Sequence, residues 1–164
     1  MNYSHIRTDL SISAPSQNLS AGANDGYSSL QVQFTSAVSE TVVVGIGGTY
    51  GLNNIKTATW PSGYENFAKD CSTFDLITGY VVTDKTLLFG KLSHFMANGY
   101  APSAPTSTFS GTGTGYGLGA RQLLTPKIFA QAEYVHTIMN DLVIGTTVEG
   151  GSTNVLSIGV GYQF

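Results

Sequence analysis

The sequence predicts an all-β protein: an eight-stranded antiparallel up-and-down transmembrane β-barrel, formed by a single domain over residues 1–164. Three observations predict it. The last eight residues alternate strictly, with Ile158, Val160, Tyr162 and Phe164 on one face of a strand and small or polar residues on the other. Seven further segments of strand length alternate in a similar way. Charged residues make up only 10% of the chain, against about 25% in soluble domains, so dense surface charge is not what keeps this protein dispersed.

Composition excludes several other classes of protein. The longest apolar runs, such as Val42–Val44 and Leu87–Phe89, are far shorter than the ~20 residues of a spanning helix. The net charge of −3 argues against nucleic-acid binding, which needs a basic patch. Cys71 is the single cysteine, so no internal disulfide can form and no metal site is predicted. A soluble lipocalin-like barrel would need a more polar exterior.

The connections between the alternating segments are long and short in turn, as in a barrel with one rim in the periplasm and the other outside. The short ones, at Ser39–Glu40, Thr83–Thr86 and Thr125–Pro126, contain turn residues or a charge. The long ones, rich in Ser, Thr, Asn, Gly and Pro, cover about 14–28, 53–71, 98–113 and 139–152. The segments themselves are 3–13, 29–38, 41–52, 72–83, 86–97, 114–124, 127–138 and 153–164.

The face that each segment turns to lipid follows from the cost of a lipid-facing Lys or Arg, roughly 2–4 kcal/mol near mid-membrane. In segment 86–97, which is apolar on both faces, Lys91 decides the orientation by pointing inward. The outward residues are predicted, segment by segment, to be Ile6, Leu10 and Ile12; Leu30, Val32 and Phe34; Val42, Val44, Ile46, Tyr50 and Leu52; Phe74, Leu76, Tyr80 and Val82; Leu88, Leu92 and Met96; Tyr116, Leu118 and Ala120; Ile128, Ala130, Ala132 and Tyr134; and Ile158, Val160, Tyr162 and Phe164.

This orientation predicts a network of charges in the lumen. An eight-stranded barrel is just wide enough for side chains to fill it, and buried charges must be paired. The individual pairs cannot be assigned from the sequence, but a structural role is favoured over an ion or proton path. The network consists of the cations Arg7, Lys91 and Arg121 and the anions Asp9, Asp75 and Glu133.

Two further sets of residues are candidates for function. His94 and His136 lie near the outer ends of their strands, but no hydroxyl and carboxylate accompany them in the order that nucleophilic catalysis needs, so no catalytic residue is predicted. The connection with Trp60, Tyr64 and Phe67 is the most aromatic one. Exposed aromatic residues can anchor a partner or lie in the headgroup belt, and a belt or self-packing role is favoured.

The whole chain resembles the small eight-stranded outer-membrane barrels, a group that includes the OmpA transmembrane domain, OmpX and porin-like surface proteins of alphaproteobacteria. The runs 116–121, 124–126 and 132–134 contribute to the resemblance. Its most specific residues, which resemble the C-terminal assembly signal of such barrels, are Ser157, Gly159, Tyr162 and Phe164. The resemblance implies a bacterial outer-membrane location, contact with outer-membrane lipid and lipopolysaccharide, and recognition by the barrel-assembly machinery. Because export needs a signal peptide, the chain is interpreted as a mature sequence with an added initiator Met.

The predicted function is that of a monomeric, non-enzymatic outer-membrane barrel with an envelope-structural or adhesin-like role. That role belongs to the four long outer loops, which could bind an extracellular ligand that the sequence does not identify. No cofactor is predicted. A narrow pore for ions or small solutes is the alternative, and a lipid A-modifying enzyme is the third candidate. Continuity of the lumen discriminates the first two.

Overall fold

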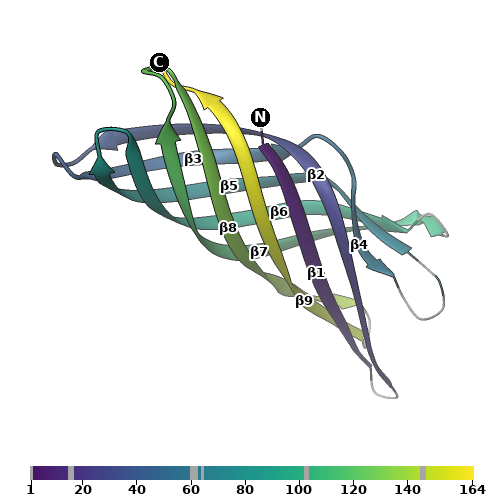
Figure 1. Cartoon of the computed structure of the whole chain (residues 1–164). Helices are drawn as coiled ribbons and strands as arrows, with labels where there is room; N and C mark the ends of the chain where they lie inside the picture. Colours follow the sequence, from purple (N-terminus) through teal and green to yellow (C-terminus); the bar gives the residue numbers. More distant parts are fainter. Residues whose placement is uncertain (1, 15–16, 60–62, 64, 102–103, 145–146) are drawn as a thin grey trace.

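The computed structural model describes residues 2–14, 17–59, 63, 65–101, 104–144 and 147–164, and within them the side chains other than those of 2–4, 6, 8–19, 21, 101–109 and 141–149. This part of the chain contains no helix long and apolar enough to cross a membrane. It forms one sheet (Figure 1) of nine strands: β1 (Asn2–Ala14), β2 (Gln17–Ala37), β3 (Val42–Gly51), β4 (Ile55–Thr59), β5 (Glu65–Thr83), β6 (Thr86–Ala101), β7 (Ala104–Leu123), β8 (Ile128–Ile144) and β9 (Thr147–Tyr162).

Eight of these strands form the wall of an antiparallel up-and-down barrel, which confirms the predicted fold. Neighbours in sequence pair with one another, and β1 pairs with both β2 and β9, so the sheet closes on itself. Closure satisfies the strand edges that lipid could not hydrogen-bond. The extra strand, β4, is short; it pairs with β5 and meets β2 at Gly22 and Thr59. Towards the short turns, residues 30–37 of β2 have paired residues only on β3.

The register fixes the tilt of the strands. A row of directly paired residues runs from Arg7 through β9, β8, β7, β6, β5 and β3 and reaches β2 at Phe34. On its other side, Arg7 pairs directly with Asn24 of β2. Phe34 and Asn24 are ten residues apart, which is the shear of the barrel. With eight strands about 4.8 Å apart and a rise of about 3.3 Å per residue, this shear gives a tilt of about 40° and a backbone radius of about 8 Å.

The long connections differ from the prediction, because much of their length is continuous β-strand. β1 and β2 stay paired from Asn2 and Ser29 out to Ala14 and Gln17, and β7 reaches back to Ala104. Alternation of apolar residues ends where the strand leaves lipid, since both faces then meet water. The hydrogen-bonded ladder needs no such alternation, so Ser- and Thr-rich strands continue beyond that point. The sequence therefore marks the end of the lipid-facing band rather than the end of the strand.

The three short turns were predicted correctly and share one chemistry. A hydroxyl oxygen at the start of each turn accepts backbone N–H groups two or three residues later, as in the turns that Ser and Thr favour. Ser39 accepts from Val42, Thr83 from Lys85, and Thr125 from Ile128, at 3.0–3.3 Å. Figure 1 shows the C-terminus on the side of these short turns, opposite the long hairpins.

The outward faces of β2, β3 and β5–β9 carry apolar side chains, as predicted. The outward residues of these strands that are exposed by two fifths or more include Phe34, Ile46, Leu76, Leu92, Leu118, Tyr134 and Ile158. Inward-pointing neighbours such as Asp75 and Lys91 are buried. The wall therefore has an apolar exterior and a polar interior.

The predicted orientation of the first strand is wrong. Arg7 is exposed and lies in the same row of the ladder as the outward-facing Leu92 and Phe34. Its partners across the ladder are Asn24 and Asn154. The prediction rested on the cost of a lipid-facing cation, but that cost falls to about 0–1 kcal/mol near the membrane interfaces. Arg7 lies close to an interface, so the rule does not apply there.

The filled lumen as candidate functional site

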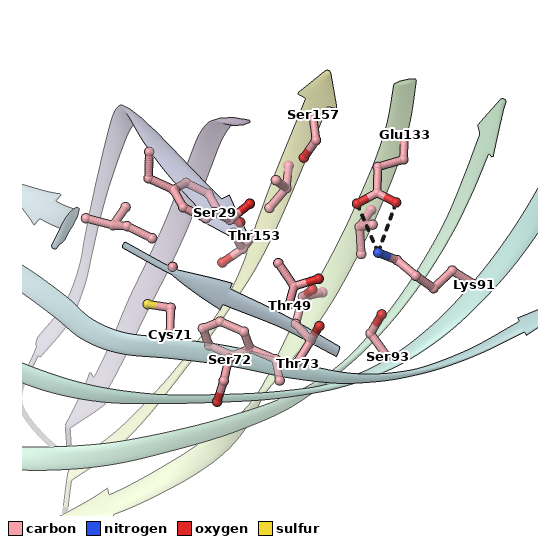
Figure 2. A pocket seen from close by; sticks show the side chains of 17 residues that line it. Ser29, Thr49, Cys71, Ser72, Thr73, Lys91, Ser93, Glu133, Thr153 and Ser157 are labelled. Carbon is pink, nitrogen blue, oxygen red and sulfur yellow. Dashed lines mark hydrogen bonds and ion pairs between the residues drawn. The ribbon is translucent and has the colours of Figure 1, made fainter. Parts of the chain in front are cut away.

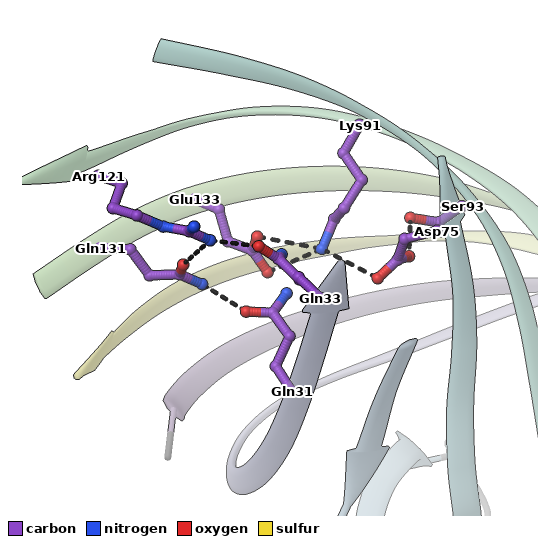
Figure 3. A network of polar contacts seen from close by, with 8 residues as sticks. All are labelled: Gln31, Gln33, Asp75, Lys91, Ser93, Arg121, Gln131 and Glu133. Carbon is purple, nitrogen blue, oxygen red and sulfur yellow. Dashed lines mark hydrogen bonds and ion pairs between the residues drawn. The ribbon is translucent and has the colours of Figure 1, made fainter. Parts of the chain in front are cut away.

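A buried ion-pair network crosses the middle of the lumen (Figure 3). Lys91 Nζ donates to both carboxylate oxygens of Glu133, at 2.9 and 3.0 Å, and lies 3.6 Å from Oδ2 of Asp75. Ser93 donates a hydrogen bond of 2.6 Å to the other carboxylate oxygen of Asp75. All four residues are buried, and Asp75 is 0% exposed. One ammonium group therefore holds two carboxylates that come from different strands.

Arg121 forms a second layer nearer the short turns. Its guanidinium donates to the side-chain oxygens of Gln33 and, at 3.1 Å, Gln131. The guanidinium carbon lies 4.2 Å from the centre of the Phe129 ring and 5.9 Å from that of Phe89, so cation–π attraction adds to the hydrogen bonds. Amides and aromatic rings thus surround this cation, and its side chain adds a second obstruction to the lumen.

A glycine on β7 makes room for one of these rings. A methyl group at Gly119 would overlap the ring of Phe89, which lies directly across the ladder. The ring therefore covers the backbone of the neighbouring strand. This arrangement explains the glycine at position 119.

On the other side of the ion pairs lies a small cavity lined by hydroxyl groups (Figure 2). Its volume is about 50 Å³, which is room for only a few water molecules. The hydroxyl oxygens of Thr49 and Thr73 are buried there without a hydrogen-bond partner among the described residues. The other serine and threonine residues of its lining are Ser29, Ser72, Ser93, Thr137, Thr153 and Ser157.

An apolar cap closes this cavity towards the long hairpins. Ile55, Ala68 and Cys71 form a buried cluster, against which Tyr27 and Phe95 pack. β4 supplies Ile55, so the strand that the sequence did not predict helps to fill the lumen. The pattern of Ile55 and Ala58, both buried, is too short to distinguish from a loop. The thiol of Cys71 is part of this packing.

The structure brings together four of the six residues predicted for the lumen network. Asp75, Lys91 and Glu133 are in direct contact, and Arg121 occupies the layer beside them. Arg7 lies on the outer face instead, and the side chain of Asp9 is outside the described residues. The sequence did not indicate that glutamines, rather than carboxylates, bind Arg121, because amides carry no charge to balance.

The other candidate residues have separate locations. Phe67 stacks on Tyr100, with ring centres 5.7 Å apart; Trp60 and Tyr64 lie outside the described residues. His94 is exposed, and His136 contacts Asn154 at 2.8 Å. No group of three or more metal-binding side chains occurs in the described part of the chain.

The C-terminal residues divide between the two faces of β9. Ser157 is buried in the lumen, and Gly159 lies on the same face. Tyr162 and Phe164 are exposed, with an edge-to-face ring contact of 5.2 Å. Two aromatic rings at the short-turn rim suit an interfacial girdle. Their recognition as an assembly signal stays a prediction.

Known proteins share this architecture. The family model "Outer membrane protein beta-barrel domain" matches residues 10–164. Among solved structures, the chain is similar to Neisserial surface protein A, with 14% identity, 99% of this chain and 97% of that chain covered, and a TM-score of 0.57. It is also similar to the attachment invasion locus protein Ail of Yersinia pestis, with 13% identity, 99% of both chains covered and a TM-score of 0.49.

A third similar structure is the outer membrane protease OmpT from Escherichia coli, with 8% identity, 99% of this chain and 96% of that chain covered, and a TM-score of 0.49. No curated protein sequence matches the chain. At these identities the structural likeness concerns the fold, while the family match covers nearly the whole sequence.

Proposed function

The chain belongs to the outer membrane protein β-barrel domain family, and from this premise we propose that it is a non-enzymatic surface-interaction protein whose long hairpins contact an extracellular partner. The barrel itself lies in the bacterial outer membrane. One observation carries the proposal: the lumen is filled by buried, mutually bonded side chains. If a filled lumen conducts no solute, the outer hairpins are the part of the barrel that can act on the exterior.

Two layers of side chains support this interpretation. Lys91 is held between Asp75 and Glu133, and Arg121 is held by Gln33 and Gln131. Moving Lys91 aside would leave two buried carboxylates without a counter-ion, at a cost of several kcal/mol, and moving Arg121 aside would leave buried glutamine oxygens unpaired. With a backbone radius of about 8 Å, the remaining space suits side chains rather than a water-filled channel.

The length of the strands supports a role outside the membrane. β2 has 21 residues, whereas about 9–11 suffice to cross a bilayer. At about 3.3 Å per residue and a tilt of about 40°, β2 extends about 50 Å along the barrel axis, against an apolar band of about 25 Å. The hairpins therefore project from the membrane as paired strands, and such strands present side chains at fixed spacing to a partner.

Shortening the hairpins tests the proposal. Ala97 and Gly111 are directly paired, so residues 98–110 can be replaced by an Asn-Gly turn without changing the register. Residues 140–150 can be replaced in the same way. Cells that display the parent barrel should attach to cultured epithelial cells, and cells that display the shortened barrels should not. Replacing Asp84-Lys85 with Asn-Gly at the opposite rim is the matched control and should leave attachment unchanged.

Two results would contradict the proposal. Attachment that persists when both hairpins are shortened, while the barrels remain folded on heat-modifiable gels, would exclude these hairpins as the contact surface. Reproducible single-channel steps of the purified parent in planar bilayers would show that the lumen opens, which would favour the narrow pore.

A further inference from the structure

The outer face near Arg7 is hollowed and polar. A groove of about 550 Å³ is lined by Arg7, Gly22, Ala23, Asn24, Lys56 and Thr59, and we call it the Arg7 groove. It contains two cations. Lys56 makes an ion pair of 2.6 Å with Glu65, and Arg7 is exposed on the strand wall.

Beside this groove, an ordered set of polar side chains covers β7, β8 and β9. Oδ1 of Asn154 lies 2.6 Å from the Tyr134 hydroxyl, which donates to it, and 2.8 Å from Nδ1 of His136. The ring of Tyr116 lies 5.3 Å from that of His136. Because its oxygen accepts both bonds, Asn154 keeps the two N–H donors of its amide for another partner.

Arg7 and Asn154 can reach the same ligand. They are directly opposite in the β1–β9 ladder, where Cβ atoms of facing residues are about 4.5–5.5 Å apart. A guanidinium is a planar fork that binds phosphate in a bidentate manner. The amide of Asn154 can add a neutral donor. Together they match a tetrahedral oxyanion.

The register places these residues at the edge of the membrane. Asn24, the other partner of Arg7, lies ten residues beyond Phe34 on β2, which is about 25 Å along the axis for strands tilted by about 40°. The apolar band of such barrels is about 25 Å tall. The row of paired residues also changes from apolar to polar as it climbs, in the order Phe34, Ile46, Leu76, Leu92, Tyr116, His136, Asn154 and Arg7.

We propose that the Arg7 groove and Asn154 bind the phosphate of a lipid headgroup in the outer leaflet. The wall directly below favours a lipid over a soluble anion, because Leu156 and Ile158 on β9 are 57% and 60% exposed and can lie against an acyl chain. Tyr116 and Tyr134 suit the interfacial level, where aromatic rings gather. This site acts on the membrane side of the barrel and does not depend on what the hairpins bind.

Native mass spectrometry of the barrel in an uncharged detergent tests the proposal. Dipalmitoyl phosphatidic acid should form a saturable one-to-one adduct with the parent. Arg7→Gln should weaken it about tenfold or more, because a charge-assisted bidentate contact is lost. Arg7→Lys should bind at an intermediate level, since it keeps the charge without the fork. Asn154→Leu should also weaken the adduct. The matched control, Lys85→Gln, removes an exposed cation at the opposite rim and should have no effect.

Two outcomes would overturn the proposal. Adducts of equal strength with the parent and with Arg7→Gln and Asn154→Leu, all folded by heat-modifiable migration, would show that these residues do not bind the phosphate. Glycerol 3-phosphate, which has the same headgroup without acyl chains, should bind at least tenfold more weakly than the lipid. If it binds as tightly, the groove is a site for soluble anions.

Discussion

Replacing Lys91 with Met removes the single ammonium that neutralises two buried carboxylates. Glu133 loses two hydrogen bonds, and Asp75 loses its counter-ion at 3.6 Å. Removing one partner of a buried ion pair costs about 3–5 kcal/mol. We therefore expect Lys91→Met to lower the free energy of unfolding by about 3–5 kcal/mol at pH 7.

Urea unfolding in lipid vesicles measures this loss. The folded fraction can be read from heat-modifiable migration on gels, and linear extrapolation gives the free energy in water. A cycle with Glu133→Gln isolates the pair. The single variant Glu133→Gln should cost less than Lys91→Met, because Lys91 retains Asp75. The coupling between the two substitutions should be about 1–3 kcal/mol, as for other directly bonded residues.

The matched control is Lys85→Met, which removes an exposed Lys in the turn between β5 and β6 and should change stability by less than about 0.5 kcal/mol. If Lys91→Met unfolds within 1 kcal/mol of the parent (about the scale of an exposed ion pair), the network does not hold the wall together. Zero coupling with Glu133→Gln would refute the assignment of this pair even if both variants were unstable.

Three further predictions concern neighbouring features of the lumen. Gly117→Ala should lower the unfolding free energy by about 1–3 kcal/mol, because a methyl group there would overlap the backbone of β8. Gly111→Ala meets no atom of the described part of the chain and should be neutral in the same urea titration. Arg121→Met should cost about 1–3 kcal/mol, because it leaves glutamine oxygens unpaired; equal urea midpoints for Arg121→Met and the parent would contradict this layer. Cys71 is buried in the apolar cap, so maleimide labelling followed by mass spectrometry should modify it only after unfolding.

The faces of most strands could be predicted because two solvents act on them. Lipid selects apolar residues on one side, and a narrow lumen selects glycine, hydroxyl groups or paired charges on the other. Lys91 is the clearest case: β6 is apolar on both faces, yet a single charge fixes its orientation, and the structure buries that charge against Glu133. A Lys on the lipid face near mid-membrane would cost roughly 2–4 kcal/mol, whereas leucines on both faces of a strand do not indicate which face is outward.

The same reasoning failed for β1 because it assumed that the whole strand lies within hydrocarbon. Arg7 belongs to the part of the wall where headgroups and water replace lipid tails, and there the apolar residues of the strand no longer indicate its outward face. The register with Asn154, and not the hydrophobic pattern, determines where Arg7 points. Directly paired residues lie on the same face of a sheet, so a strand whose outward face is known determines the outward face of its neighbour.

The wrong prediction for β1 and the unpredicted extension of the strands have one physical origin. Hydrophobic alternation reports only the band of the wall that lies in lipid, whereas the hydrogen-bonded ladder continues past it. Below the boundary, Lys91 is held between the buried carboxylates of Asp75 and Glu133. At and above the boundary, a cation on the outer wall no longer incurs the mid-membrane cost, so Arg7 can remain exposed and meet a headgroup. The residues of both proposed roles therefore lie at or beyond the edge of the band that hydrophobic alternation marks in the sequence.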